Sequence, residues 1–297
     1  GMDTTVYGCV IHDSAAQGIT VGGGYGHTVE KCDIYNVTNY MSDAGAVYFN
    51  TGVLGRGSRV VDNYIHDIVC GYRNNVNSEV YAIYLDDFTG GAVVSGNTIA
   101  NIRKAGKIGG GRDNTITNNI IIGEMNGINY DNRGDMSTPY AKALFHPSAM
   151  AGSTSQFNGT GGGLYSGYFV LKANPEYDPE KWYAKYPGFK KLTEDIELEK
   201  AYWVALNDDS ITDKDSHYYD AALPVNNVMT NNVSINPIGY ELPFEFWWDW
   251  RTQYNTNHTN NLAVAAKIYN QRDVTQFSEN GNTFVSGSEN VAAAKAW

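Results

Sequence analysis

Three aspartates occupy places where they could act as a catalytic acid and base. Asp43 directly precedes the apolar segment 44–49, and Asp86 and Asp87 directly follow the similar segment 82–85. Hydrolysis of a glycosidic bond needs two carboxyl groups, ~5–5.5 Å apart for retention of configuration and ~6.5–9.5 Å apart for inversion. If the two segments are strands on neighbouring coils, we expect Asp43 and Asp86 to fall in that range. Asp86 and Asp87 could instead accept backbone N–H bonds in a turn.

A polar and aromatic stripe is predicted on one outer face of the same strands. Side chains alternate along a strand, so the inward positions are Val47, Ile83 and Ile128 and the outward ones are Tyr48, Tyr84, Asn129, Asn50, Asp86 and Asp131. This alternation turns Asp86 and Asp87 to opposite sides, which favours Asp86 as the group that faces substrate. Tyr48, Tyr84 and Tyr130 could stack on the apolar faces of sugar rings, or they could cover another part of the protein.

Basic residues near the acidic turns give further candidates for substrate binding. Lys107 lies two residues before the glycines 109–111, and Arg112 and Asp113 follow them. Glycine allows close approach to a ligand, so Arg112 could hold a sugar hydroxyl or carboxylate. Asp113 could bind sugar or orient Arg112, and a tight turn built by Asp and Gly is the alternative.

Two histidines stand beside aspartates at equivalent places in a repeat. His66 precedes Asp67, and His12 precedes Asp13. One of them could carry a proton or donate a hydrogen bond to a sugar, but recurrence at one register also suits a purely structural role. The sequence has no HxxxH or CxxC spacing, so we predict no zinc site.

These candidates are positioned by a repeat of the form aliphatic-x-x-(Cys/Asn)-x-aliphatic. Its central residues are Cys9, Cys32, Asn63, Asn97 and Asn119, with spacings of 23, 31, 34 and 22 residues, and then Asn232, Asn261 and Asn282. Such periods are typical of solenoids, and short apolar segments stacked coil on coil predict parallel strands. The sequence therefore predicts an all-β protein, a right-handed parallel β-helix in which the amides stack as a ladder.

The repeat is interrupted over residues 133–226. Residues 133–170 are rich in Gly, Ser and Thr and are expected to form a loop, whereas residues 178–206 predict one or two helices with a break at Pro187. We interpret this as an insertion in a single solenoid domain covering residues 1–297. The later cluster of Trp247, Trp248 and Trp250 is either buried against the last coils or a sugar-binding platform.

The composition limits the classes of molecule that the protein is expected to bind. The formal net charge is −11 with no run of Lys or Arg, which argues against nucleic acid and anionic membranes. Three cysteines in 297 residues predict packed thiols rather than a disulfide framework, and no apolar stretch of ~18 residues is present to span a membrane. A carbohydrate partner and secretion to the periplasm or cell surface are expected, with any export signal or upstream cap missing before Gly1.

Six segments carry a family resemblance. They are residues 42–48, 63–68, 82–87, 109–114, 182–187 and 224–233. Together they resemble the bacterial β-helix proteins grouped around glycoside hydrolase family 141, whose characterised activities are on fucosylated pectin and on xylan. The resemblance implies the same fold, and it implies that aspartates of the Ser42-Asp43 and Asp86-Asp87 motifs act as acid and as nucleophile or base. Relatives usually have more chain before the first coil.

Three functions remain open from the sequence. The leading one is a glycoside hydrolase that uses an aspartate pair on plant-type polysaccharides or oligosaccharides and needs no cofactor. A polysaccharide lyase would use a Lys or Arg base and usually Ca²⁺ held by several carboxylates, and Lys104, Lys107 and Arg112 leave that route open. A non-catalytic glycan-binding solenoid is the third.

Overall fold

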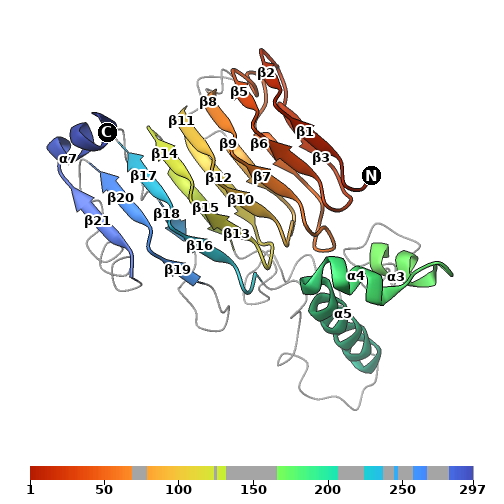
Figure 1. Cartoon of the computed structure of the whole chain (residues 1–297). Coiled ribbons are helices and arrows are strands. Elements are labelled where there is room, and N and C mark those ends of the chain that lie inside the picture. The colour runs from red at the N-terminus through yellow and green to blue at the C-terminus, as the bar shows by residue number, and fades with distance from the viewer. Residues whose placement is uncertain are drawn as a thin grey trace.

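The computed structural model describes residues 1–68, 79–123, 126–131, 166–206, 224–236, 244–246, 257–265 and 281–296. Its strands form three sheets in which all paired strands are parallel, and successive strands of the chain move from one sheet to the next, except that the last two described strands lie in the same sheet. Figure 1 shows the coils stacked from the N-terminus to the C-terminus as one solenoid. The predicted right-handed parallel β-helix is confirmed.

Each sheet contains at most one strand from each coil. The first sheet contains β1 (Thr5–Tyr7), β4 (Thr28–Glu30), β7 (Arg59–Val61), β10 (Val93–Ser95), β13 (Thr115–Thr117), β16 (Val228–Thr230) and β19 (Asn257–Thr259). The second contains β2 (Val10–His12), β5 (Asp33–Tyr35), β8 (Tyr64–Ile68), β11 (Thr98–Ile102), β14 (Ile120–Ile122), β17 (Val233–Asn236), β20 (Leu262–Ala265) and β21 (Thr283–Ser286). The third contains β3 (Ile19–Val21), β6 (Ala44–Phe49), β9 (Val80–Leu85), β12 (Lys104–Gly109), β15 (Asn126–Asp131) and β18 (Phe244–Phe246).

The core consists of columns of aliphatic side chains, each column formed by one register position in successive coils. In the second sheet, for example, one column runs through Ile11, Ile34, Ile65, Ile99 and Ile121. Its members from Ile34 onward are at most 1% exposed. β-Branched residues suit this arrangement because their branched side chains pack well on a pleated surface.

The predicted ladder lies at the corner between the first and second sheets. The Oδ1 atom of Asn119 lies 3.1 Å from the backbone N of Asn97 and 2.9 Å from its Nδ2, and equivalent bonds join the later rungs through Asn282. Before each rung the chain turns through a positive φ, for example 54° at Asp62 and 57° at Asn118, which Asn, Asp and Gly adopt most readily. The ladder therefore satisfies polar groups that the corner buries.

The interruption of the repeat contains three described helices that form a lobe beside the solenoid (Figure 1). They are α3 (Ser166–Ala173), α4 (Pro179–Lys185) and α5 (Pro187–Leu206). Asp178 begins α4 by accepting the N–H groups of Glu180 and Lys181 at 3.1 and 3.4 Å, and a proline suits the first position of a helix. α3 begins inside residues 133–170, which had been predicted as loop.

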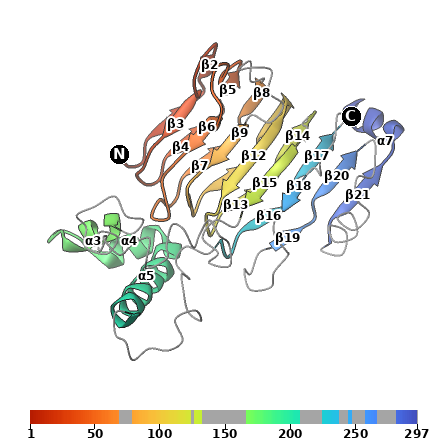
Figure 2. The ribbon, with the colours of Figure 1, turned by 180° about the vertical axis from the view of Figure 1, so that it is seen from behind.

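The lobe packs on the turns that follow third-sheet strands. Phe189 and Leu192 of α5 are fully buried in a cluster with Val53, which follows β6, and Phe88, which follows β9. The lobe is thus fixed to one corner of the solenoid. Figure 2 shows the lobe near the early coils and α7 (Ser288–Ala296) at the opposite end, where Val291 packs with Ile235 and Val264. None of the described helices is long and apolar enough to cross a membrane.

Candidate functional site

One register position on the outer face of the third sheet carries the predicted stripe. Tyr48 pairs with Tyr84, Tyr84 with Lys107 and Lys107 with Asn129. The four side chains therefore form a row across four coils, which extends about 14 Å at ~4.8 Å per coil. Tyr84 and Asn129 are buried, so Tyr48 and Lys107 are the members of this row that keep part of their surface accessible.

The tyrosines of this row are tied to two of the predicted aspartates. The Tyr48 hydroxyl donates to Oδ2 of Asp86 at 2.8 Å, and the Tyr84 hydroxyl lies 3.2 Å from Oδ1 of Asp43. Two effects raise the pKa of Tyr48, burial being the larger and the hydrogen bond to Asp86 the next. Tyr48 therefore stays a hydrogen-bond donor at neutral pH. Tyr84 is only 2% exposed. The predicted sugar stacking on Tyr84 is therefore wrong, since its ring is covered, and only the half-buried Tyr48 keeps partial access.

Asp43 and Asp86 lie just outside opposite ends of the paired strands β6 and β9. Ala44 pairs with Val80, so Asp43 stands beside Glu79 at the beginning of the strands. Asp86 lies seven residues beyond Glu79 (86 − 79 = 7), at the other end. Contacts through two tyrosines link the carboxyl groups of Asp43 and Asp86: the hydrogen bonds at the two ends measure 3.2 and 2.8 Å, and the rings of Tyr84 and Tyr48 lie 5.3 Å apart between centroids. The pair of Asp43 and Asp86 as acid and base stays a prediction.

A different aspartate stands close to Asp86 in the sheet. Leu85 pairs with Ile108 of β12, so the next residue, Asp86, stands beside Gly109. Gly109 pairs with Asp131 of β15. Positions 86 and 131 are therefore two coils apart, about 9.6 Å at the backbone, and the residue between them has no side chain.

Asp87 belongs to the turn that follows Asp86. Its φ is 39° and that of Phe88 is 65°, which turns the chain away from the strand direction toward the helical lobe. Its Oδ2 atom lies 3.5 Å from Nδ2 of Asn50. Asp87 therefore lies in a turn, which was the alternative to a catalytic role for this residue.

The same strands carry a charged cluster near their beginning, in which Lys104 and Lys107 were candidates from the sequence and Glu79 was not. Glu79 pairs with Nζ of Lys104 at 2.9 Å and Nζ of Lys107 at 3.5 Å, and it accepts from the Tyr81 hydroxyl. Burial acts to raise the pKa of Glu79, but the bonds from Tyr81 and Lys104 and the charges of both lysines leave it lowered. The sequence pattern could have indicated Glu79, because it directly precedes β9 just as Asp43 directly precedes β6.

Arg112 attaches the lobe, which corrects its prediction as a sugar ligand, and Oδ2 of Asp113 lies 3.3 Å from Nε of Arg112, in line with the alternative that Asp113 orients this side chain. The Arg112 side chain is 3% exposed, and its Nη1 lies 3.0 Å from Oδ2 of Asp195 in α5. Asp113 has a φ of 60° and accepts from Nη2 of Arg56 at 3.2 Å and from Nδ2 of Asn226 at 3.0 Å. Burial lowers the pKa of Arg56 to about 10, so it remains charged at neutral pH.

His66 lies on the outer face of the second sheet and so does not belong with Asp86. Its two ring nitrogens face Asp33 at 3.0 Å and Asp67 at 2.7 Å. Its ring stacks on Tyr35, with centroids 5.0 Å apart, and Tyr35 stacks on His12 at 4.9 Å. The recurrence of His12 and His66 at one register is explained by this stack.

Several other candidates are settled by their placement. Tyr130 is 8% exposed in the core, and its hydroxyl donates to the carbonyl of Pro224 at 2.9 Å, so its predicted exposure to sugar is wrong. Cys9 and Cys32 are free thiols. Within the described residues, no group of three or more His, Cys, Asp or Glu could hold a metal ion. Trp247, Trp248 and Trp250 lie outside the described residues.

Comparisons with known proteins give one structural likeness. No family model matches the chain, and no curated protein matches it. Among solved structures it is similar to the tailspike protein of E. coli bacteriophage HK620, a mutant in complex with a pentasaccharide, with a TM-score of 0.43 and 11% sequence identity. The match covers 96% of this chain and 34% of the tailspike chain, so this chain spans about a third of the tailspike's length. Membership of glycoside hydrolase family 141 stays a prediction.

Proposed function

We propose that this protein is a glycan-processing solenoid, a glycoside hydrolase whose reacting groups are Asp86 and Asp131, which the register of the third sheet places two coils apart. The observation that carries the proposal is their register on either side of Gly109. Their backbone separation of about 9.6 Å lies beside the ~6.5–9.5 Å that inverting glycosidases keep between carboxyl groups. The proposal therefore includes inversion at the anomeric carbon.

The surroundings of Asp86 suit a reacting carboxyl group. Asp86 is 5% exposed and is held by the Tyr48 hydroxyl at 2.8 Å, so its orientation is fixed before substrate binds. Gly109, which stands between positions 86 and 131, has no side chain. Tyr48 and Lys107, the half-buried members of the row, offer contacts to neighbouring sugar units.

The test compares three aspartate variants on one sheet. Asp86→Asn and Asp131→Asn should each lower turnover of pectic or xylan oligosaccharides by ~10²–10⁴-fold, the usual contribution of an acid or base. Asp43→Asn is the matched control, because Asp43 stands at the opposite end of the same face, and it should leave turnover unchanged. Full turnover by Asp86→Asn, or a loss confined to Asp43→Asn, would overturn the proposal.

The products distinguish the hydrolase from the lyase. New reducing ends without ultraviolet absorbance of an unsaturated uronate, and an inverted anomer by proton NMR, are expected for the hydrolase. Lys107 lies in the sugar-facing row beside Asn129 and favours the lyase as second candidate, with Lys107 as the base that removes the α-proton. Absorbing products that disappear in Lys107→Met would decide for that reaction.

A further inference from the structure

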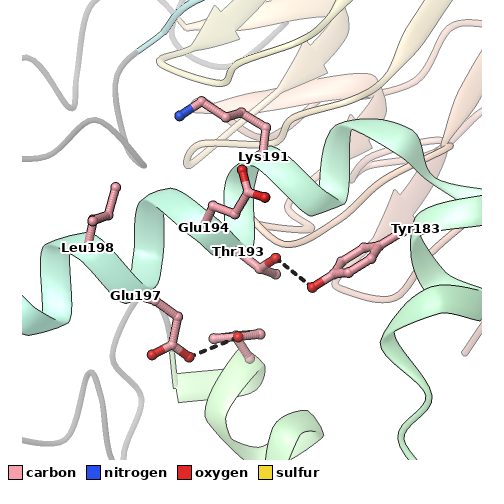
Figure 3. A pocket seen from close by; sticks show the side chains of 7 residues that line it. Tyr183, Lys191, Thr193, Glu194, Glu197 and Leu198 are labelled. Carbon is pink, nitrogen blue, oxygen red and sulfur yellow. Dashed lines mark hydrogen bonds between the residues drawn. The ribbon is translucent and has the colours of Figure 1, made fainter.

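A pocket separate from the third sheet lies in the helical lobe. It is a shallow, open hollow of about 540 Å³ beside α5 (Figure 3), within the ~300–1,000 Å³ that ligand sites usually have. Its lining consists of Tyr168, Tyr183, Lys191, Thr193, Glu194, Glu197 and Leu198. Most of these residues come from α5, where spacings of three and four residues place side chains on one face of a helix.

Two tyrosine hydroxyls are held in place inside the pocket. The Tyr168 hydroxyl donates to Oε1 of Glu197 at 2.9 Å, and the hydroxyls of Tyr183 and Thr193 lie 3.1 Å apart. Burial, and then the bond to Glu197, raises the pKa of Tyr168, so this group remains an uncharged donor. The pocket thus has fixed aromatic walls and a set of hydroxyl and carboxylate groups.

The charges around the pocket favour an uncharged polar ligand. Glu194 and Glu197 disfavour an anion, and Lys191 together with Lys172, whose Nζ contacts Glu197, disfavours a cation. An apolar ligand would desolvate these charged groups without replacing their hydrogen bonds. Sugars combine apolar ring faces with hydroxyls that donate and accept, and an open pocket admits a segment of a longer chain.

The same helix that lines the pocket is joined to the solenoid near Asp86. Asp195, one residue after Glu194, forms the buried ion pair with Arg112, and Leu192 packs in one cluster with Phe88. Phe88 follows Asp86 by two residues. We propose that the pocket is a second glycan-binding site, which holds neutral sugar units of a polysaccharide while another part of it lies on the third sheet. This inference rests on the proposed function in taking a glycan as the ligand.

The test measures binding to the chain of residues 1–297 carrying Asp86→Asn, so that turnover does not consume the probe. Xylohexaose is the neutral probe, and NMR should show shifts at Thr193 and Glu194 that saturate. Adding Glu194→Ala should weaken that binding about tenfold, and Glu176→Ala is the matched control, an exposed glutamate of the same lobe outside the pocket.

Equal affinity in the Glu194→Ala and Glu176→Ala variants, or shifts confined to the third sheet, would overturn the second site. The two proposals fail separately. Turnover by the unmodified chain with no shifts in α5 removes only the second site, whereas saturable shifts in α5 without turnover of any oligosaccharide remove only the hydrolase.

Discussion

Oδ1 of Asn97 accepts hydrogen bonds from both nitrogens of Asn63, from the backbone N at 3.0 Å and from Nδ2 at 2.9 Å. Nδ2 of Asn97 in turn donates to the carbonyl of Val60 and to Oδ1 of Asn119, both at 2.9 Å. One amide therefore joins three consecutive coils at a corner where both asparagines are at most 2% exposed. Without it, buried polar groups of two neighbouring coils lose their partners.

Asn97→Ala should lower the free energy of unfolding by about 3 kcal/mol, since each buried polar group left without a partner costs roughly 1–3 kcal/mol. Urea unfolding followed by circular dichroism measures the change. Asn174→Ala is the control, because Asn174 is an exposed asparagine of the lobe outside the ladder, and it should cost less than about 0.5 kcal/mol. Similar losses in both variants would contradict a special role for the ladder.

Tyr48→Phe tests whether Tyr48 positions Asp86. The variant removes the hydroxyl that donates to Asp86 at 2.8 Å and keeps the ring. Under the proposed function we expect kcat to fall about tenfold with little change in KM, because one lost hydrogen bond of ~1.4 kcal/mol in the transition state corresponds to a factor of ten. Tyr40→Phe is the matched control, with a ring that is 72% exposed. An unchanged kcat in Tyr48→Phe would leave Tyr48 with a structural role alone.

His258 should make stability depend on pH. It lies in β19 in register with Met229, and burial lowers its pKa to about 4, against roughly 6.5 in the unfolded chain. The unfolded chain therefore binds the proton more tightly between these values. The contribution of His258 is complete above about pH 6.5 and is lost as the pH falls toward 4, by roughly 2 kcal/mol at pH 5.

The measurement is the free energy of unfolding at pH 7.5 and at pH 5. His258→Met places in this column the residue that stands one coil earlier, and it should reduce the difference between the two pH values by roughly 2 kcal/mol. Met229→Leu changes the same column without a titrating group, so its cost should be equal at both pH values. An unaltered pH dependence in His258→Met would show that the pKa of this histidine is the same in the folded and the unfolded chain.

The repeat could be predicted from sequence because its rules are local. The spacing from Val60 to Asn63 to Ile65 predicts that the two aliphatic side chains point inward and that Asn63 lies at the turn and forms the ladder. The inward positions follow from the alternation of side chains along a strand. If the same rule is applied strictly, it places Tyr130 inward, because its neighbour Asn129 faces outward. Tyr130 pairs with Ile108 in the core column.

The site was less predictable because it depends on contacts between distant residues. Asp43 and Asp86 lie on one face, but the strand between Glu79 and Asp86 separates them along its length, and only the register defines that offset. Arg112 looked like a ligand because its partner Asp195 is 83 residues away in a helix of the lobe. No local pattern indicates which loop an inserted helix will cover, so its burial could not be foreseen.

The ion pair of Arg112 and Asp195 should hold the lobe to the solenoid. Both side chains are 3% exposed and lie 3.0 Å apart, and removing one partner of a buried pair costs roughly 3–5 kcal/mol because the other charge stays buried. Asp195→Ala is therefore expected to lower the melting temperature or to expose α5 to limited proteolysis while the coils remain folded. Lys191→Ala removes the other cation that contacts Asp195, from a side chain that is 63% exposed. Exposed ion pairs contribute about 0–1 kcal/mol, so the protease should cleave the Lys191→Ala variant no faster than the unmodified chain. If the two variants are equally sensitive to the protease, the apolar cluster around Phe189 alone holds the lobe.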